Sequence, residues 1–273
     1  MSGWKDAPPP VFRIGPTGWL RVMWRGFWVG SVTYGGLAVL LLVRLFEWPL
    51  FGQARPFTPY ITQAVCRIAL WLMRLRLVVH GRPMTAPGAI VANHSSWLDI
   101  FVLNAAQRVY FVAKSEVAGW PGIGWLARAT GTLFIARKGT EAKRQKEEFE
   151  ARLHAGHRLL FFPEGTSTDG IRVLPFKSTL FEAFFSPGLV RVMHIQPITV
   201  VFHAPQGEDA RHYGWWGDMD FANHLLKTLA TGRQGRVEVT FHPEVPVDAF
   251  ENRKVLAQHC ERVIRTAHVN AEQ

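Results

Sequence analysis

The sequence predicts an α/β domain with a mixed, largely parallel sheet flanked by helices, preceded by an N-terminal membrane helix and an amphipathic interfacial helix. Two observations support this fold class. From residue 77 onward, short apolar runs of strand length alternate with longer segments of helical periodicity. Before residue 77, one apolar stretch is about as long as a bilayer is thick. We therefore expect a tail and anchoring helices over residues 1–76 and a globular domain over residues 77–273.

The composition narrows the range of partners. Of 273 residues, 48 % are hydrophobic, and 11 Trp and 19 Phe suit a chain with one face at a membrane interface. The net charge of +10 favours anionic lipids or phosphorylated substrates. Nucleic acid would share this preference, but the cations are spread along the chain and no nucleic-acid motif is present, so we predict no such partner. Cys66 and Cys260 form no metal-ligand pattern, which predicts free thiols.

The first 76 residues are predicted to form a tail and two membrane-binding helices. Residues 1–18 are rich in Pro and Gly and are expected to be loosely ordered. Residues 27–46 have the length of a membrane span, although Arg44 lies near the end, so full span and deep insertion both stay open. Residues 60–76 carry cations beside an apolar stripe, which predicts a basic helix in the interface plane. The basic residues place the globular domain on the cytoplasmic side of the inner membrane.

In the globular part, strands and helices are expected to alternate. Strands are predicted at residues 77–81, 89–92, 109–114, 132–137, 158–162, 195–202 and 236–242. Helices are predicted at residues 97–104, 121–129, 140–154 and 253–268. Because the strand at 236–242 alternates between apolar and polar residues, we expect it at an edge of the sheet.

A histidine and an aspartate stand at the first strand-to-helix corner. The strand at 89–92 runs into Asn-His-Ser-Ser, which is loop and helix-cap chemistry, and Asp99 follows His94 by five residues. On one continuous helix these positions point about 140° apart, so they meet only if His94 precedes the helix and Asp99 lies in its first turns. A carboxylate that holds an imidazole orients a general base. Taken alone, the pair is more simply interpreted as a cap and a solvated acid.

Two further segments place polar residues at the carboxyl ends of strands, where sites form in α/β folds. Arg137 and Lys138 follow one strand, and Arg137 can clamp a phosphate bidentately, while Lys138 can equally begin the next helix. Glu164, Gly165 and Thr166 follow another strand. Glu164 can accept hydrogen bonds from substrate hydroxyls, and Gly165 allows close backbone approach. A purely structural turn is the alternative.

These segments resemble, in order, the motifs of the glycerolipid acyltransferases of the bacterial lysophosphatidic acid acyltransferase type. The matching blocks are the HxxxxD motif at 93–99, the Arg-containing block at 131–139, Phe-Pro-Glu-Gly-Thr at 162–166 and Ile-Gln-Pro-Ile at 195–198. One departure matters, because Ser167 follows Glu-Gly-Thr where many members have Arg. Residues 173–177 and 213–219 resemble features of lyso-ornithine lipid acyltransferases.

The resemblance implies a membrane-bound enzyme that moves a fatty acyl chain from a thioester of CoA or acyl carrier protein to a lysolipid hydroxyl. His94 would take the hydroxyl proton, Asp99 would orient His94, and backbone N–H groups near this corner would stabilise the oxyanion. The acceptor would be bound by Arg137, Lys138, Glu164, Gly165 and Thr166. No metal or cofactor is expected, since the nucleophile is the substrate's own hydroxyl.

The acceptor and even the class of protein have alternatives at this stage. The first choice of acceptor is 1-acylglycerol-3-phosphate, which would give phosphatidic acid, and a lyso-ornithine lipid is the alternative. A non-catalytic protein that binds membrane lipids through its charge and aromatic helices is the alternative from another class. In that interpretation His94 is a helix cap.

Overall fold

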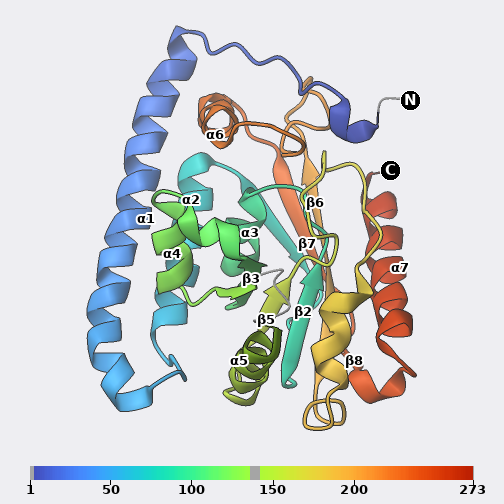
Figure 1. Ribbon diagram of the computed structural model, residues 1–273. Helices are drawn as coiled ribbons and strands as arrows, with labels where there is room; N and C mark the ends of the chain where they lie inside the picture. The colour runs from blue at the N-terminus through green and yellow to red at the C-terminus, as the bar shows by residue number, and fades with distance from the viewer. Residues whose placement is uncertain (1–2, 136–141, 273) are drawn as a thin grey trace.

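The computed structural model describes residues 3–135 and 142–272, in which one sheet carries helices on both faces (Figure 1). Its strands are β1 (Arg76–His80), β2 (Gly88–Ala92), β3 (Tyr110–Lys114), β4 (Leu133–Ile135), β5 (Leu159–Phe161), β6 (His194–His203), β7 (Arg236–Phe241) and β8 (Val245–Pro246). Their order is β1-β7-β6-β2-β5-β3-β4, with β8 beside β6. All neighbours pair in parallel except β6 with β7 and β6 with β8. The mixed, largely parallel sheet is thus confirmed.

The expected edge position of residues 236–242 is wrong. β7 pairs with β1 on one side and with β6 on the other, so it lies inside the sheet. The side chains of β7 alternate between more and less buried, because one face of the strand is more covered than the other. Facial burial is independent of whether both sides of a strand are hydrogen bonded, so the pattern carried no information about the edge.

Two apolar cores lie on opposite faces of the sheet. Along β2, Ile90 and Ala92 belong to one core, and Ala89 and Val91 to the other, as the two-residue period of a strand requires. The first core is closed by helices α2 (Thr58–Met73), α3 (Leu98–Ala106) and α6 (Phe221–Ala230). The second is closed by α5 (Ala142–His154), α7 (Arg253–Glu272) and the 3-10 helix at Ser178–Phe185. Because β2 is buried on both faces, its carboxyl end is a rigid base for the residues that follow it.

The helices agree with the sequence in most places. They are α1 (Pro16–Phe51), α2 (Thr58–Met73), α3 (Leu98–Ala106), α4 (Ile123–Ala129), α5 (Ala142–His154), α6 (Phe221–Ala230) and α7 (Arg253–Glu272). The sequence analysis did not predict α6, the 3-10 helix at Ser178–Phe185 or β8. For α6 a signal was present, because Asp220 caps it by accepting a hydrogen bond from the N–H of Asn223.

The N-terminal segment is more ordered than its composition suggests. A short 3-10 helix spans Trp4–Asp6, and α1 begins at Pro16, inside the segment expected to be loose. Trp216 donates a hydrogen bond to the carbonyl of Ala7, which ties this segment to the domain. Among the described residues, α1 is the one helix long and apolar enough to cross a membrane by length and composition.

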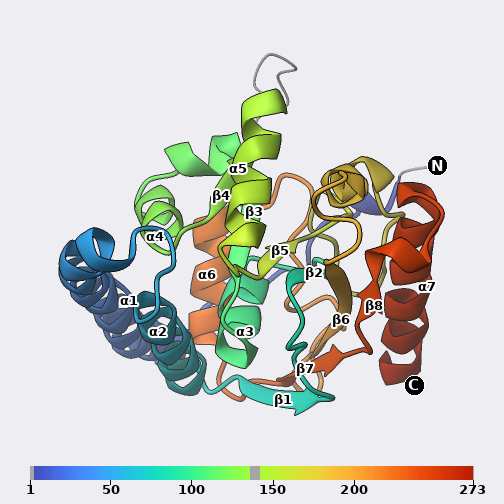
Figure 2. The same ribbon diagram turned by 90° about the horizontal axis from the view of Figure 1, so that it is seen from below.

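Helix α1 is attached to α6 toward its amino end and to the start of α2 toward its carboxyl end. It lies along α2 and touches α6, as Figures 1 and 2 show. The buried Arg25 guanidinium donates hydrogen bonds to the carbonyls of Leu229, Thr231 and Gly232 at the end of α6. Toward the other end, the buried carboxylate of Glu47 accepts hydrogen bonds from Thr58 at the start of α2.

We expect Arg25→Met to lower the free energy of unfolding by about 2 kcal/mol, because it leaves buried α6 carbonyls without donors. Urea unfolding in detergent measures this effect. Arg13→Met, at an exposed position before α1, is the matched control and should be neutral. Equal stability of the two variants would show that Arg25 does not hold α1 to α6.

Candidate active site

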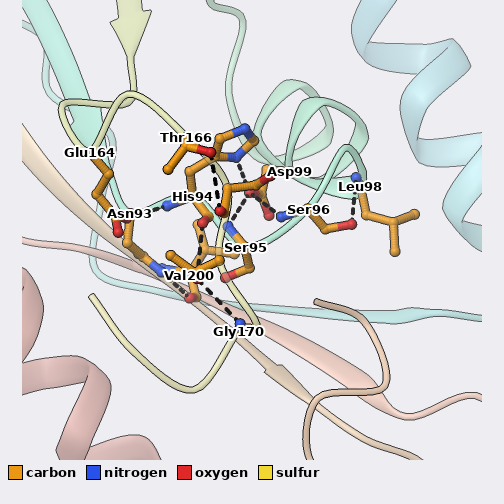
Figure 3. A network of polar contacts seen from close by, with 12 residues as sticks. Asn93, His94, Ser95, Ser96, Leu98, Asp99, Glu164, Thr166, Gly170 and Val200 are labelled. Atoms are coloured by element: carbon orange, nitrogen blue, oxygen red, sulfur yellow. Dashed lines mark hydrogen bonds and ion pairs between the residues drawn. The ribbon is translucent and has the colours of Figure 1, made fainter. Parts of the chain in front are cut away.

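His94 and Asp99 meet as the sequence predicted. His94 follows the carboxyl end of β2, and Asp99 lies in the first turn of α3. Their side chains are joined by a contact of 2.7 Å between Nδ1 of His94 and Oδ2 of Asp99 (Figure 3). Asp99 is fully buried, whereas 19 % of the His94 side chain is exposed. An imidazole held from behind by a carboxylate can therefore still meet a substrate.

The hydrogen bonds around Asp99 determine the tautomer of His94. The same Oδ2 atom accepts the backbone N–H groups of Ser95 at 2.8 Å and Ser96 at 3.0 Å. An oxygen that accepts these bonds acts as a carboxylate acceptor, so Nδ1 of His94 must be the donor in their contact. The proton therefore sits on Nδ1, which leaves the lone pair on Nε2. This is the form of histidine that a general base needs.

The His94 ring is also fixed from one side by Phe162. The two rings stack with centroids 4.0 Å apart and planes 11° from parallel. Phe162 follows β5, the strand that pairs in parallel with β2. The aromatic residue of the Phe-Pro-Glu-Gly-Thr segment thus restricts the rotation of the imidazole, a role that the sequence analysis missed.

Glu164 contacts the backbone of the chain itself. Its Oε1 accepts the N–H of His94 at 2.7 Å, and its Oε2 accepts the N–H of Leu174 at 2.6 Å. Burial raises the pKa of Glu164 to about 8, although these two N–H groups act in the opposite direction. The sequence analysis expected this carboxylate to bind substrate hydroxyls, whereas in the structure both oxygens hold the loops around the histidine.

The same bonds change the expected source of oxyanion donors. The N–H groups of His94, Ser95 and Ser96 all donate to carboxylates, the first to Glu164 and the other two to Asp99. They are therefore occupied in this structure, and donors for a tetrahedral oxyanion must come from other groups.

Contacts distant in sequence hold the corner in place. The side-chain amide of Asn93 donates to the carbonyl of Val200 and accepts from its N–H, both at 2.8 Å, which joins β2 to β6. The N–H of Thr168 donates to the carbonyl of His94, and the N–H of Trp215 to that of Ser95. Sequence reasoning missed these contacts of Asn93, Thr168 and Trp215. Only the position of Asn93 directly before His94 could have drawn attention to it.

Of the remaining predicted site residues, Gly165 and Thr166 lie in the part of the chain that the structure describes, and Arg137 and Lys138 do not. Gly165 adopts a positive φ of 72°, and a Cβ there would lie 2.5 Å from Nζ of Lys177, so the position favours glycine. The Thr166 hydroxyl donates to the carbonyl of Ser167 at 3.4 Å. Arg137 and Lys138 lie outside the described residues. The structure therefore brings Glu164 to the His94–Asp99 pair and does not address the two cations.

The nearby cations of the third block have different surroundings. Arg172 forms an ion pair with the buried carboxylate of Asp169, with Nη2 and Oδ2 2.8 Å apart, so its charge is largely compensated. Lys177 is exposed and lies against Gly165, beside the Glu164 turn. Of these two cations, Lys177 is the one whose charge is directed to the loop of the site.

Comparison with known proteins identifies the family of the chain. The model of the Acyltransferase family matches residues 76–201. The chain is 57 % identical to a lyso-ornithine lipid O-acyltransferase of Rhodobacter capsulatus, over 96 % of this chain and 95 % of the relative. It is 37 % identical to a 1-acyl-sn-glycerol-3-phosphate acyltransferase of Neisseria gonorrhoeae, over 36 % of this chain and 39 % of that one.

The fold also matches a solved structure. The crystal structure of the 1-acyl-sn-glycerophosphate (LPA) acyltransferase PlsC from Thermotoga maritima superposes with a TM-score of 0.66. The match covers 93 % of this chain and 96 % of that chain at 21 % identity, so it shows a shared fold.

The raised pKa of Glu164 predicts a pH-dependent stability. The folded chain keeps this proton up to about pH 8, whereas an unfolded carboxyl loses it near pH 4.5, so the free energy of unfolding should fall as the pH rises between these values. The slope is at most about 1.4 kcal/mol per pH unit. Glu164→Gln should flatten it, as measured by urea unfolding from pH 6.5 to 8.

The buried histidines contribute with the opposite sign at the lower end of this window. Burial lowers the pKa of His157 and His212 to about 4 and that of His224 to about 3, so all three are neutral there when folded, whereas an unfolded histidine still takes up protons near pH 6.5. The original chain and the variant share this contribution, so the effect of Glu164 is the difference between their two pH profiles. Parallel pH profiles for the original chain and Glu164→Gln would show that Glu164 is ionised throughout this range.

Proposed function

The chain belongs to the glycerolipid acyltransferase family and is an acyltransferase of lysolipids, and from that premise we propose that its acceptor is a lyso-ornithine lipid. The observation that carries this proposal is the 57 % identity to a protein of that name along almost the whole of both chains. The relative named for 1-acyl-sn-glycerol-3-phosphate matches little more than a third of the chain. The comparisons thus favour the alternative acceptor over the first choice of the sequence analysis.

The charges near the site support a headgroup without phosphate. Ser167 stands where many family members carry Arg, and Arg172 is compensated by Asp169. An ornithine headgroup carries a carboxylate and an ammonium in place of phosphate. Lys177, beside Gly165, is suited to pair with such a carboxylate as a single point charge.

The proposed reaction is a direct transfer with His94 as the general base. Nε2 of His94 removes the proton of the acceptor hydroxyl as its oxygen attacks the thioester carbonyl carbon. The Asp99 carboxylate stabilises the imidazolium that forms. When the tetrahedral intermediate collapses, the carbon–sulfur bond breaks. The departing thiolate of CoA or acyl carrier protein then takes the proton from Nε2 of His94. The products are an ester and a free thiol, and this route passes through no acyl-enzyme.

Three residues position the base in this proposal. Glu164 and Asn93 hold the backbone on either side of the β2 carboxyl end, and Phe162 holds the ring of His94. These contacts keep Nε2 at one place relative to the sheet. Since a misplacement of about 1 Å can cost a hundredfold in rate, this support matters for catalysis.

We further propose that α1 and α2 bind the cytoplasmic surface of the inner membrane. The face of α1 opposite its buried stripe is apolar and exposed, and includes Leu20, Trp24, Phe27, Leu42 and Leu45. Such a face suits a lipid interface, where both the lysolipid and the acyl chain reside.

The attachment of α1 favours binding in the membrane plane over a full span. Arg25 contacts the end of α6, and Glu47 contacts the start of α2, which packs on α3; the two residues are about 33 Å apart along the helix axis at 1.5 Å per residue. This separation is about the thickness of the hydrocarbon core. A spanning α1 would carry one of these attachments to the far side of the membrane, whereas an in-plane helix keeps both.

The acceptor is tested by acyl transfer with purified protein in detergent. With one acyl thioester donor, we expect transfer to lyso-ornithine lipid and much slower transfer to 1-acylglycerol-3-phosphate. His94→Ala should lower the rate by at least about a hundredfold, because it removes the general base. The readout is the diacylated product, resolved by mass spectrometry.

The two acceptors and the His94 variant test the proposed headgroup and the proposed base separately. Faster transfer to 1-acylglycerol-3-phosphate would contradict the proposed headgroup and leave the acyltransfer chemistry intact. Near-normal transfer by His94→Ala would contradict the proposed base.

Membrane binding by the apolar face of α1 is tested with a charged double variant. Phe27→Glu with Leu45→Glu should weaken binding to lipid vesicles by at least about tenfold, since burying each large apolar side chain contributes about 2 kcal/mol. Vesicle flotation measures the bound fraction. The matched control is Val255→Glu with Val269→Glu, two exposed positions on α7. Equal losses in both double variants would show that α1 is not the binding face.

A further inference from the structure

A second polar site lies at the amino-terminal ends of the parallel strands, whereas His94 lies at their carboxyl-terminal ends. There the amino ends of β3 and β5 meet the loop between α1 and α2 around a cavity of about 150 Å³. We call this space the arginine cavity. Its polar lining is formed by Arg55, Arg108, His157 and Arg158, with Tyr60 and Tyr110 beside them. None of the described residues that line it is acidic.

The polar groups of the arginine cavity are mainly donors. Nη1 of Arg55 donates a hydrogen bond to the carbonyl of Ala129. The guanidinium of Arg108 lies 4.1 Å from the ring centroid of Tyr60. Behind the cavity, Arg152 donates to Nδ1 of His157 at 2.5 Å, so Nε2 of His157 carries its proton. The lining thus offers guanidinium N–H groups to a guest that accepts hydrogen bonds.

The positive charge there is only partly compensated. Burial lowers the pKa of Arg55 and of Arg152, and the charge of Arg44 lowers both further, whereas Glu47 raises that of Arg55 and Glu148 raises that of Arg152. Glu47 lies nearby in α1, but its oxygens accept hydrogen bonds from Phe57, Thr58 and Arg44. Cations held close together at a half-buried site are stabilised by a bound anion.

The surroundings indicate where such an anion comes from. The neighbouring end of α1 and the loop after it expose apolar side chains, namely Trp48, Leu50, Phe51 and Phe57. Phe57 lies next to Pro56, which lines the cavity. We propose that the arginine cavity binds the phosphate of an anionic membrane lipid while these apolar side chains enter the membrane interface. Guanidinium groups match phosphate because they donate bidentately.

This site is separate from the acyl-transfer site. His94 follows the carboxyl end of β2, whereas the cavity lies where β3 and β5 begin, and all three strands run in parallel. A lipid bound in the cavity would orient the enzyme on an anionic membrane without entering the reaction. Acyl transfer in neutral detergent should therefore be unchanged when the cavity is altered.

Vesicle flotation of the full chain tests the proposal. We compare vesicles of phosphatidylcholine alone with vesicles that also contain phosphatidylglycerol, for the original chain, Arg108→Gln and Arg158→Gln. Each variant should bind the anionic vesicles about fivefold more weakly, the effect expected of one cation near such a surface. Arg108→Lys should retain part of the binding, since it keeps the charge and loses the planar fork.

The matched control is Arg262→Gln, which removes the same charge from an exposed position on α7, on the other face of the sheet. It should bind nearly as the original chain does. An equal loss for Arg262→Gln would overturn the proposal, because binding would then follow net charge and not the cavity.

A second measurement distinguishes lipid from soluble phosphate. Inorganic phosphate at millimolar concentration is added, and thermal unfolding is followed for the same variants. If stabilisation by phosphate depends on Arg108 and Arg158 but vesicle binding does not, the cavity binds a soluble phosphate, and the proposal of a lipid ligand is overturned. If neither vesicle binding nor phosphate stabilisation depends on them, the cavity is not an anion site.

Discussion

One oxygen of Asp99 accepts the hydrogen bonds on which the active site depends. Oδ2 takes Nδ1–H of His94 and the N–H groups of Ser95 and Ser96. A fully buried carboxylate is costly unless such donors surround it, so the corner after β2 folds around this atom. The same bonds place the proton of the neutral ring on Nδ1 and leave Nε2 for the role of base that we propose.

A second buried acidic side chain supports the corner from the neighbouring strand. Glu164 follows β5 and accepts the N–H of His94, while Asn93 reaches β6 through Val200. Three adjacent strands of the sheet thus hold one histidine. This arrangement fits an enzyme whose nucleophile arrives with the substrate, because the protein needs only a fixed base and room beside it.

Helix α1 carries the membrane contact that we propose. Its attachments through Arg25 and Glu47 orient one apolar face outward along the side of the domain. One of its ends lies near α6, and the other lies by the arginine cavity (Figure 1). A membrane bound along this helix would meet apolar side chains over most of its length and cations near the cavity, which is the pattern of an interfacial anchor.

The sequence by itself determined most strands, the long apolar helix, the His94–Asp99 contact and the family. Each of these depends on local information, namely periodicity, cap residues and short motifs in order. The tertiary structure alone decided that Glu164 binds the backbone of His94, 70 residues away, and that Asn93 binds Val200, 107 residues away. It also placed β7 between β1 and β6. Such contacts join segments whose local patterns are compatible with many partners, so the partner is determined only when the whole sheet packs.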